Sequence, residues 1–266
     1  MQSKAKIGQS VMFACITASI FHNTGIHNEG GLDGKIDMTE SVFKQKQQLL
    51  TAAMEMFGGL YFMTMNAFMG NFFNAILLFQ AERPVFLREQ ANKMYRVLPY
   101  YISKLIVDTP VMLVTPMLAT LIIYWSIGLA STVEQFFGAY LIQVMCALAA
   151  SSFGYLLSSI FENETAATSL APLFIMPMML FGGLFTNNAE APGWLGWIQY
   201  ISPIKYCAEG LMRNEFKFDE RGIRDNLLSF LGYNMTYWDC FFVFLAIILV
   251  CRIVAFFTFS ALVRKF

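Results

Sequence analysis

Long apolar runs separated by shorter polar segments form the main pattern of this chain. A helix that crosses a bilayer needs about 20 predominantly apolar residues, and six runs approach or exceed that length. After the second run, Pro84 is suited to a first helical turn and a short amphipathic helix is predicted to follow it. The predicted spans cover residues 4–24, 49–79, 98–127, 135–160, 167–185 and 238–262, with the amphipathic helix at 84–96 and an outer segment at 190–236.

The outer segment is too short and too interrupted by polar residues to cross a membrane. Trp194, Trp197 and Tyr200 are spaced so that their rings can sit at a membrane interface, where aromatic side chains are enriched. We therefore expect a re-entrant or interfacial helix here, followed by an outer loop.

The stretch from Ala81 to Arg96 is densely charged and lies between two apolar runs. Charges at this density are costly in hydrocarbon, so the stretch is expected at a membrane surface. Two interpretations stay open at this point. It is either a basic loop that fixes topology or a lever on which another protein domain pushes.

A few polar residues interrupt the predicted spans. Asn66 and Asn74 are eight residues apart and share a helical face, whereas Asn71 lies on another side. Such side chains face a water-filled cavity or form hydrogen bonds between helices. Lys104 and Asp108 are four residues apart, so they can pair and lower each other's cost in the membrane.

Composition identifies the class of protein. The 266 residues are 57% hydrophobic and 14% charged, with a mean hydropathy of +0.53, whereas soluble domains carry about 25% charge. The chain is therefore expected to be an all-α, multi-pass membrane protein. Its net charge of +0 gives no sign of nucleic-acid binding. The 27 Phe and 17 Met are typical of an adaptable apolar cavity or of lipid-facing surface.

No metal site is predicted, because the five Cys lack CxxC spacing and His22 and His27 have no ligand cluster around them. Cys207 and Cys240 fall near the outer side and either form a disulfide or remain free thiols. Asn234 begins an Asn-Met-Thr glycosylation sequon on the same side.

Basic residues in short loops set the expected topology. Lys4 and Lys6, the charged stretch, and Arg264 with Lys265 fall on one side if there are six spans. Both termini are then cytosolic, although lysines at 35, 44 and 46 in the first outer loop weaken the rule. The choice between plasma membrane and an internal membrane stays open.

Two motifs carry a family resemblance. ERPVFLREQANKMYR followed by LPYYISKLIVDTP resembles the segment after the second transmembrane helix of G-subfamily ABC transporters, the White and pleiotropic-drug-resistance type. LFGGLFTN and WLGWIQYISPIKYCAEGLMRNEF resemble that family's fifth-helix end, re-entrant helix and Asn-Glu-Phe segment. The resemblance covers roughly Lys4 to Phe266. It implies the membrane domain of a type II ABC exporter, with six spans, a cytosolic coupling helix and an outer re-entrant helix.

The resemblance also implies roles for particular residues. The charged stretch would be the coupling helix, which contacts a nucleotide-binding domain or neighbouring inner loops through Glu82, Arg83, Arg88, Glu89 and Arg96. The Lys104–Asp108 pair would brace the third helix. A substrate cavity would lie between Phe62, Asn66, Met69 and Phe73 on one wall and Ile175, Met176 and Met179 on the other, closed outward by a plug of Leu184 and Phe185.

The chain departs from the family pattern because it contains no GxxxxGK[ST] motif, ABC signature or Walker B residue. ATP and Mg would therefore bind a partner nucleotide-binding domain, and this chain is not expected to be an enzyme by itself. We expect a fragment, a shortened gene model or a permease subunit.

The expected function is ATP-driven export of a lipid, sterol or apolar xenobiotic by two such domains in a homo- or heterodimer. A non-transporting scaffold or an ion-driven carrier are the alternatives, but a carrier needs buried ionisable groups that are scarce here. A membrane-embedded enzyme is disfavoured, because no group of His, Asp or Glu residues lies within the spans.

Overall fold

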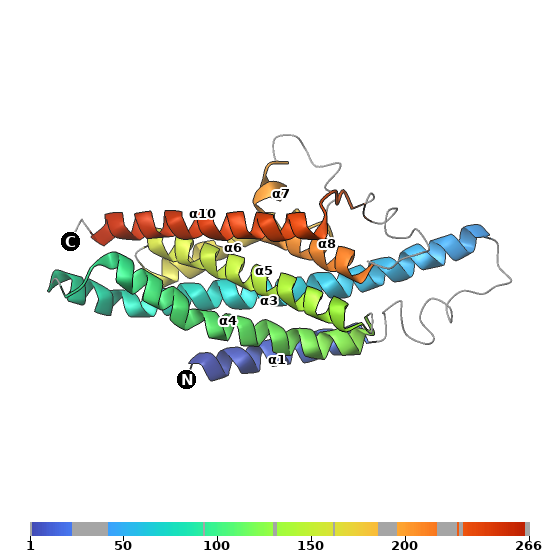
Figure 1. The fold of residues 1–266 in the computed structure, drawn as a ribbon, viewed down its shortest axis with the longest axis horizontal. Helices are drawn as coiled ribbons and strands as arrows, with labels where there is room; N and C mark the ends of the chain where they lie inside the picture. Colours follow the sequence, from blue (N-terminus) through green and yellow to red (C-terminus); the bar gives the residue numbers. More distant parts are fainter. Residues whose placement is uncertain are drawn as a thin grey trace.

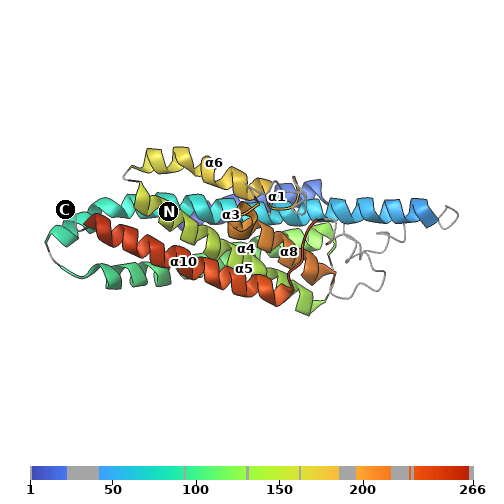
Figure 2. The same cartoon turned by 90° about the horizontal axis from the view of Figure 1, so that it is seen from above.

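The structure is a computed structural model that describes residues 2–22, 42–92, 94–129, 132–161, 163–185, 196–216, 228 and 231–263. Every regular element in these ranges is a helix, and the long helices run side by side in an elongated bundle (Figure 1 and Figure 2). The helices are α1 (Gln2–Ile20), α3 (Val42–Ala91), α4 (Val97–Ile127), α5 (Val133–Ile160), α6 (Glu164–Leu180), α7 (Ile198–Ile201), α8 (Pro203–Glu215) and α10 (Tyr237–Val263).

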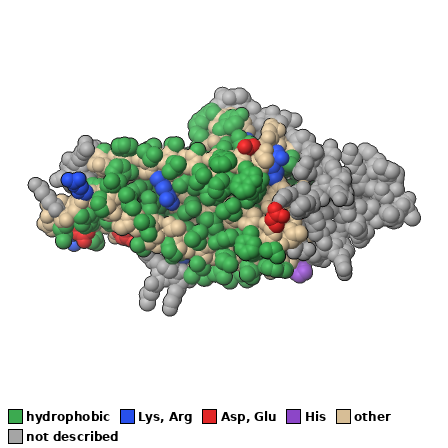
Figure 3. Space-filling view, viewed as in Figure 1, with side chains coloured by type: hydrophobic (Ala, Val, Ile, Leu, Met, Phe, Trp, Pro, Cys, Tyr) green, Lys and Arg blue, Asp and Glu red, His purple; other side chains and the backbone are tan. Residues whose placement is uncertain are grey.

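Four of the described helices are long and apolar enough to cross a membrane: α3, α4, α5 and α10. Helices α1 and α6 are apolar but shorter, with 19 and 17 residues. The surface of the bundle agrees with a location in a membrane, because Figure 3 shows hydrophobic side chains over most of one side and few charged groups among them. On α10, large apolar residues such as Phe242, Leu249 and Phe257 are exposed, as expected for a helix that contacts lipid.

Helix α3 is longer than predicted. It runs without interruption through 50 residues, including Pro84, so its length is about 75 Å. The separate amphipathic helix expected at residues 84–96 is therefore wrong, since α3 continues through Pro84 and ends at Ala91. Proline removes one backbone hydrogen bond, but packing compensates: Phe86 is buried, with its ring 4.3 Å from Tyr100 and 4.8 Å from Phe259.

Helices α3 and α5 approach each other closely because α5 has a face of small residues. Ala147, Ala150, Ser151 and Gly154 on this helix are all buried. A Cβ atom at Gly154 would lie 2.7 Å from the carbonyl oxygen of Phe72 and 2.8 Å from the Cβ of Ala75. Small residues allow such backbone contacts between membrane helices, so dispersion contacts and not bulky side chains hold this pair together.

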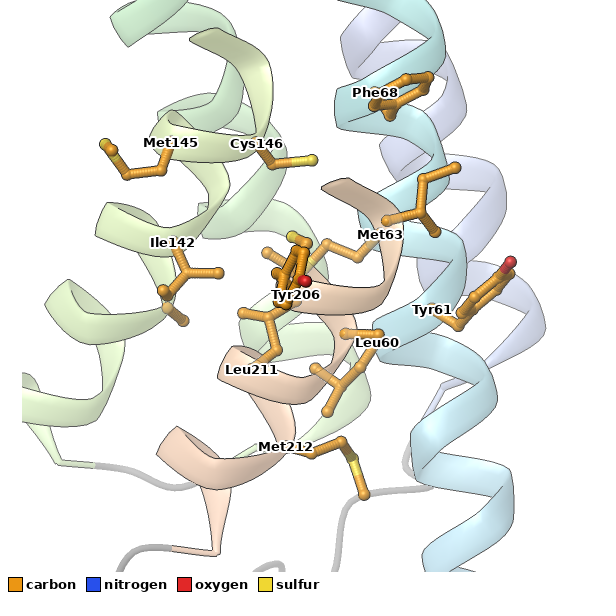
Figure 4. Packing of buried hydrophobic residues seen from close by; sticks show 14 of the residues in the cluster. Leu60, Tyr61, Met63, Phe68, Ile142, Met145, Cys146, Tyr206, Leu211 and Met212 are labelled. Carbon is orange, nitrogen blue, oxygen red and sulfur yellow. The ribbon is translucent and has the colours of Figure 1, made fainter. Parts of the chain in front are cut away.

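Helix α8 occupies the centre of the main core, between α3 and α5 in Figure 4. All of its 13 residues except Arg213 are buried, and Tyr206, Leu211 and Met212 pack against Leu60 and Ile142. The Ser202 side chain caps its N-terminus by accepting a hydrogen bond from the Lys205 N–H at 3.4 Å. This burial within the bundle favours the re-entrant over the interfacial alternative for the outer segment.

Candidate functional site

The end of α3 contacts the neighbouring helices through its charged residues. Arg83 is buried and donates a hydrogen bond to the carbonyl oxygen of Phe161, at 2.5 Å, just after α5 ends. Gln80 donates to the same carbonyl at 2.8 Å. These bonds satisfy a carbonyl that the helix end leaves without an intrahelical partner. Arg83 therefore lies against the connection between α5 and α6, which the predicted topology places on the inner side.

The other residues of the charged stretch divide into two groups. Arg88 and Arg96 are exposed and available to another domain. Glu89 instead accepts a hydrogen bond from the Tyr95 hydroxyl, just beyond the helix end. Partial burial, together with this bond to the carboxylate, raises the pKa of Tyr95 to about 12. Tyr95 therefore remains a protonated donor at physiological pH and holds the α3–α4 connection in place.

Lys104 is the centre of a buried ionic network between α3, α4 and α5. Its predicted partner Asp108 lies 3.9 Å away, but its ammonium makes a closer ion pair with Glu82 of α3. Asp108 accepts a hydrogen bond from the Tyr155 hydroxyl at 2.5 Å, and Glu82 accepts one from the Tyr100 hydroxyl at 3.2 Å. Glu82 was expected to face another domain or an inner loop, and in this chain it pairs with α4.

Another charged residue of this region, Arg252 of α10, was missed in the sequence. Its Nε atom donates to the Ser152 hydroxyl at 3.1 Å, and its carbonyl accepts from the Tyr101 hydroxyl at 3.1 Å. The signal that could have found it is a lone arginine within an apolar run that extends from Tyr237 to Val263.

A cavity of about 620 Å³ lies between α1, α3 and α4. The four α3 residues predicted for the cavity, Phe62, Asn66, Met69 and Phe73, all line it. The predicted opposite wall on α6 does not line it, although α6 packs against α3. Ile175 lines a separate apolar cavity of about 330 Å³ between α5, α6 and α7. Met176 is exposed, and Met179 packs against the core.

Three asparagine side chains of α3 are among the polar residues that line the large cavity. Asn66, Asn71 and Asn74 all line it, although Asn71 was expected on a different side of the helix. Asn71 donates to the Ala67 carbonyl at 2.7 Å. Among the described residues, the Asn66 Nδ2 and Asn71 Oδ1 atoms are buried without a hydrogen-bond partner. Because all three asparagines line the cavity and the Asn71 bond stays within α3, the structure favours the cavity interpretation over hydrogen bonding between helices.

The predicted plug residues Leu184 and Phe185 follow the end of α6, which lies at Leu180 and not at 185 as expected. Two tyrosines hold this turn. The Tyr61 hydroxyl donates to the Met179 carbonyl at 2.6 Å, and the Tyr233 hydroxyl donates to the Gly182 carbonyl at 2.6 Å. These tyrosines were not predicted, since nothing in their sequence spacing relates them to α6.

Two further features fix the turn that contains the predicted plug residues. The Phe185 ring packs edge-on against Tyr61, with the ring centroids 6.0 Å apart and an interplanar angle of 82°. Gly183 has a φ of 101°, a conformation that glycine adopts at little cost, and a Cβ atom there would collide with the Tyr233 hydroxyl. The turn is therefore ordered by specific contacts on both sides.

The two outer-side predictions have different outcomes. The disulfide between Cys207 and Cys240 is wrong, because both residues are buried free cysteines on α8 and α10. Cys207 instead points at α3, where its sulfur accepts a hydrogen bond from the Thr64 hydroxyl at 3.4 Å. Asn234 is exposed in the segment before α10, and its glycosylation stays a prediction.

Comparison with known proteins identifies the family. The model of the ABC-2 type transporter matches residues 1–216. Protein white of Ceratitis capitata is 35% identical over 175 residues, which are 66% of this chain and 26% of that protein. The Rattus norvegicus broad substrate specificity ATP-binding cassette transporter ABCG2 is 34% identical over 160 residues, 60% of this chain and 24% of that protein.

A third relative is the ABC transporter ATP-binding protein/permease wht-1 of Caenorhabditis elegans, 35% identical over 136 residues, 51% of this chain and 20% of that protein. The chain thus spans about a quarter of the length of the curated relatives it matches. Its apolar helices make it an integral membrane protein. The chain belongs to the ABC-2 type transporter family, as a transmembrane domain of the G-subfamily type.

Proposed function

We propose that this chain is the transmembrane domain of an ATP-driven exporter that moves a lipid, a sterol or an apolar xenobiotic across a membrane. The observation that carries the proposal is the cavity of about 620 Å³ between α1, α3 and α4, with walls of Phe, Met and Ala and few polar atoms. Its volume is in the range of small-molecule sites. Methionine and phenylalanine walls adapt to apolar ligands of different shapes.

ATP and Mg bind a separate nucleotide-binding domain in this proposal. The relative wht-1 is named an ATP-binding protein/permease, which supports a nucleotide-binding partner. Arg88 and Arg96 are exposed next to the end of α3 and provide the contact surface. Closure of the partner around ATP moves the end of α3, and the Glu82–Lys104 ion pair passes this movement to α4. Because α3 and α4 both line the cavity, the movement changes its shape.

A second transmembrane domain, identical or different, completes the transporter. The exposed apolar residues of α6, Leu173, Met176 and Leu180, offer a surface for it, and oligomers of this kind are commonly two-fold symmetric. In this dimer, Met176 faces the substrate at the two-fold axis, as the resemblance implied. The plug of Leu184 and Phe185 separates the cavity from the outer side and opens when the cavity collapses.

The test is ATP-dependent movement of a fluorescent apolar lipid in proteoliposomes that contain this chain with its nucleotide-binding partner. Met69→Trp fills the cavity and is expected to abolish transport while the protein stays folded. Leu249→Trp on the exposed face of α10 is the matched control and is expected to transport normally. Equal transport by both variants would remove the cavity from the pathway.

Phe185→Ala tests the plug in the same vesicles. Loss of the ring that packs on Tyr61 is expected to raise leak or basal ATP turnover, because the closed turn loses one of its contacts. Normal gating in this variant would remove Phe185 from the site.

A further inference from the structure

Lys6 is a buried cation that faces the large cavity. It lies in α1, its exposed fraction is 7%, and it lines the space together with Phe13, Phe62 and Met69. Within the described part of the chain, its ammonium group makes no hydrogen bond and no ion pair. The Lys6 Nζ atom keeps some accessible surface, so a ligand in the cavity that Lys6 lines can reach the ammonium group.

The nearest acidic residue does not provide the missing partner. Asp108 is the acidic residue whose charge acts on Lys6, but its carboxylate is already engaged by the Tyr155 hydroxyl at 2.5 Å and lies 3.9 Å from Lys104. Glu82 is committed to Lys104 in the same way. Asp108 therefore offsets part of the Lys6 charge, while the Lys6 N–H groups stay available to a ligand in the cavity.

The position of this charge gives the cavity two chemically different ends. Helices α1 and α3 run in opposite directions (Figure 1), so Lys6 near the start of α1 lies toward the Leu77 end of the α3 wall, and Phe62 lies toward the other end. The Ser10 hydroxyl donates to the Thr115 carbonyl at 3.5 Å, which places α1 against α4. The cavity thus offers a cation at one end and aromatic and thioether side chains along the rest.

We propose that the cavity binds an amphiphilic anion, with a carboxylate, sulfate or phosphate group at Lys6 and an apolar body along Phe62, Met65 and Met69. This inference rests on the proposed function and names the substrate class of the same cavity. A charge-assisted hydrogen bond is stronger than one between neutral groups, so an anion gains more at Lys6 than a neutral ligand of the same shape.

Binding of a matched pair of fluorescent probes tests the proposal. The chain is placed in nanodiscs of phosphatidylcholine and titrated with a polyene fatty acid and with its uncharged methyl ester. The acid is expected to bind roughly tenfold more tightly or better. Lys6→Met is expected to remove this preference with ester binding unchanged, and Lys6→Arg to keep it.

Lys205→Met is the matched control, because Lys205 is also a buried lysine but lies on α8, outside the cavity. It is expected to keep the preference for the acid. Equal binding of acid and ester by the unmodified chain, or a preference that survives Lys6→Met, would overturn the proposal. Loss of the preference in both lysine variants would overturn it as well, since the effect would then be one of general charge.

A second arm identifies the source of the anion. Nanodiscs that contain phosphatidic acid displace the probe if a lipid headgroup occupies the Lys6 end, and leave it bound if a free amphiphile is the ligand. Either result supports anion binding. The measurement needs neither ATP nor a partner, so its failure is separable from failure of the proposed export. Export with identical substrate selectivity in Lys6→Met would reject only the present inference.

Discussion

Replacing Lys104 by Met removes the one cation that joins Glu82 on α3 to Asp108 on α4. The side chain of Lys104 is 5% exposed and that of Asp108 is 11% exposed, whereas Glu82 is 44% exposed. After the substitution, Glu82 can return to water at little cost. Asp108 cannot, so it remains a buried carboxylate whose described partner is the Tyr155 hydroxyl.

These exposures determine the expected size of the effect. Removing one member of a fully buried ion pair costs about 3–5 kcal/mol, and an exposed pair contributes about 0–1 kcal/mol. The Lys104–Glu82 pair, with Glu82 partly exposed, belongs near the range for exposed pairs. The Lys104–Asp108 pair, in which both side chains are largely buried, belongs near the range for buried pairs. We therefore expect Lys104→Met to lower the free energy of unfolding by about 2–4 kcal/mol. For a chain of this size, the midpoint of thermal unfolding falls on the order of 10 °C.

Thermal unfolding in mild detergent, followed with a thiol-reactive dye, measures this change. The dye reports unfolding because Cys146, Cys207, Cys240 and Cys251 are buried. Lys104→Arg keeps the charge and is expected to cost less than the Met variant. Adding Asp108→Asn to Lys104→Met removes the stranded carboxylate and is expected to recover part of the loss. A Lys104→Met protein that melts like the unmodified chain, or strict additivity with Asp108→Asn, would refute the buried network.

Three other substitutions test separate parts of the molecule. Arg88→Ala with Arg96→Ala removes two exposed side chains and is expected to leave folding intact but to uncouple ATP hydrolysis from transport in the assembled protein; normal coupling would favour the topology-fixing loop instead. Tyr233→Phe deletes the bond to the Gly182 carbonyl and is expected to lower unfolding free energy by about 1–3 kcal/mol, measured with the same dye; an unchanged midpoint would argue against the tyrosine contact. Gly154→Val places branched carbon atoms against the Phe72 carbonyl and is expected to lower the free energy of unfolding by about 1–3 kcal/mol or more. Gly8→Val is the control that should be tolerated, because Gly8 has open space around it.

The apolar runs predicted the long helices well because burial in lipid leaves one solution for the backbone, a helix with all its hydrogen bonds internal. Helices α4, α5 and α10 begin and end within two residues of the predicted runs at 98–127, 135–160 and 238–262. The failure at the end of α3 has a different cause. Judged from neighbouring residues alone, Pro84 favours the start of a new helix. The contacts of Phe86 that keep α3 continuous are made with α4 and α10, which are distant in the sequence.

The candidate site was predicted where it depends on one helix and was missed where it depends on two. Phe62, Asn66, Met69 and Phe73 share a face of α3, and helical spacing is enough to place them together. The α6 wall required knowledge of how α6 packs, which the chain order does not contain. The ion pairs of Lys104 show the same limit. Its partner Asp108, four residues away, could be predicted from the sequence, whereas its partner Glu82 on α3 could not.

The uninterrupted course of α3 makes its charged end continuous with the wall of the large cavity. A helix of 50 residues is about 75 Å long, so tilting it by about 5° around one end moves the other by roughly 6 Å. Because α3 stays helical through Pro84, the aromatic cavity wall and Tyr61 lie on the same helix as Arg88. In the proposed transporter, one helix therefore carries a push at its charged end to Tyr61, the tyrosine that holds the turn after α6.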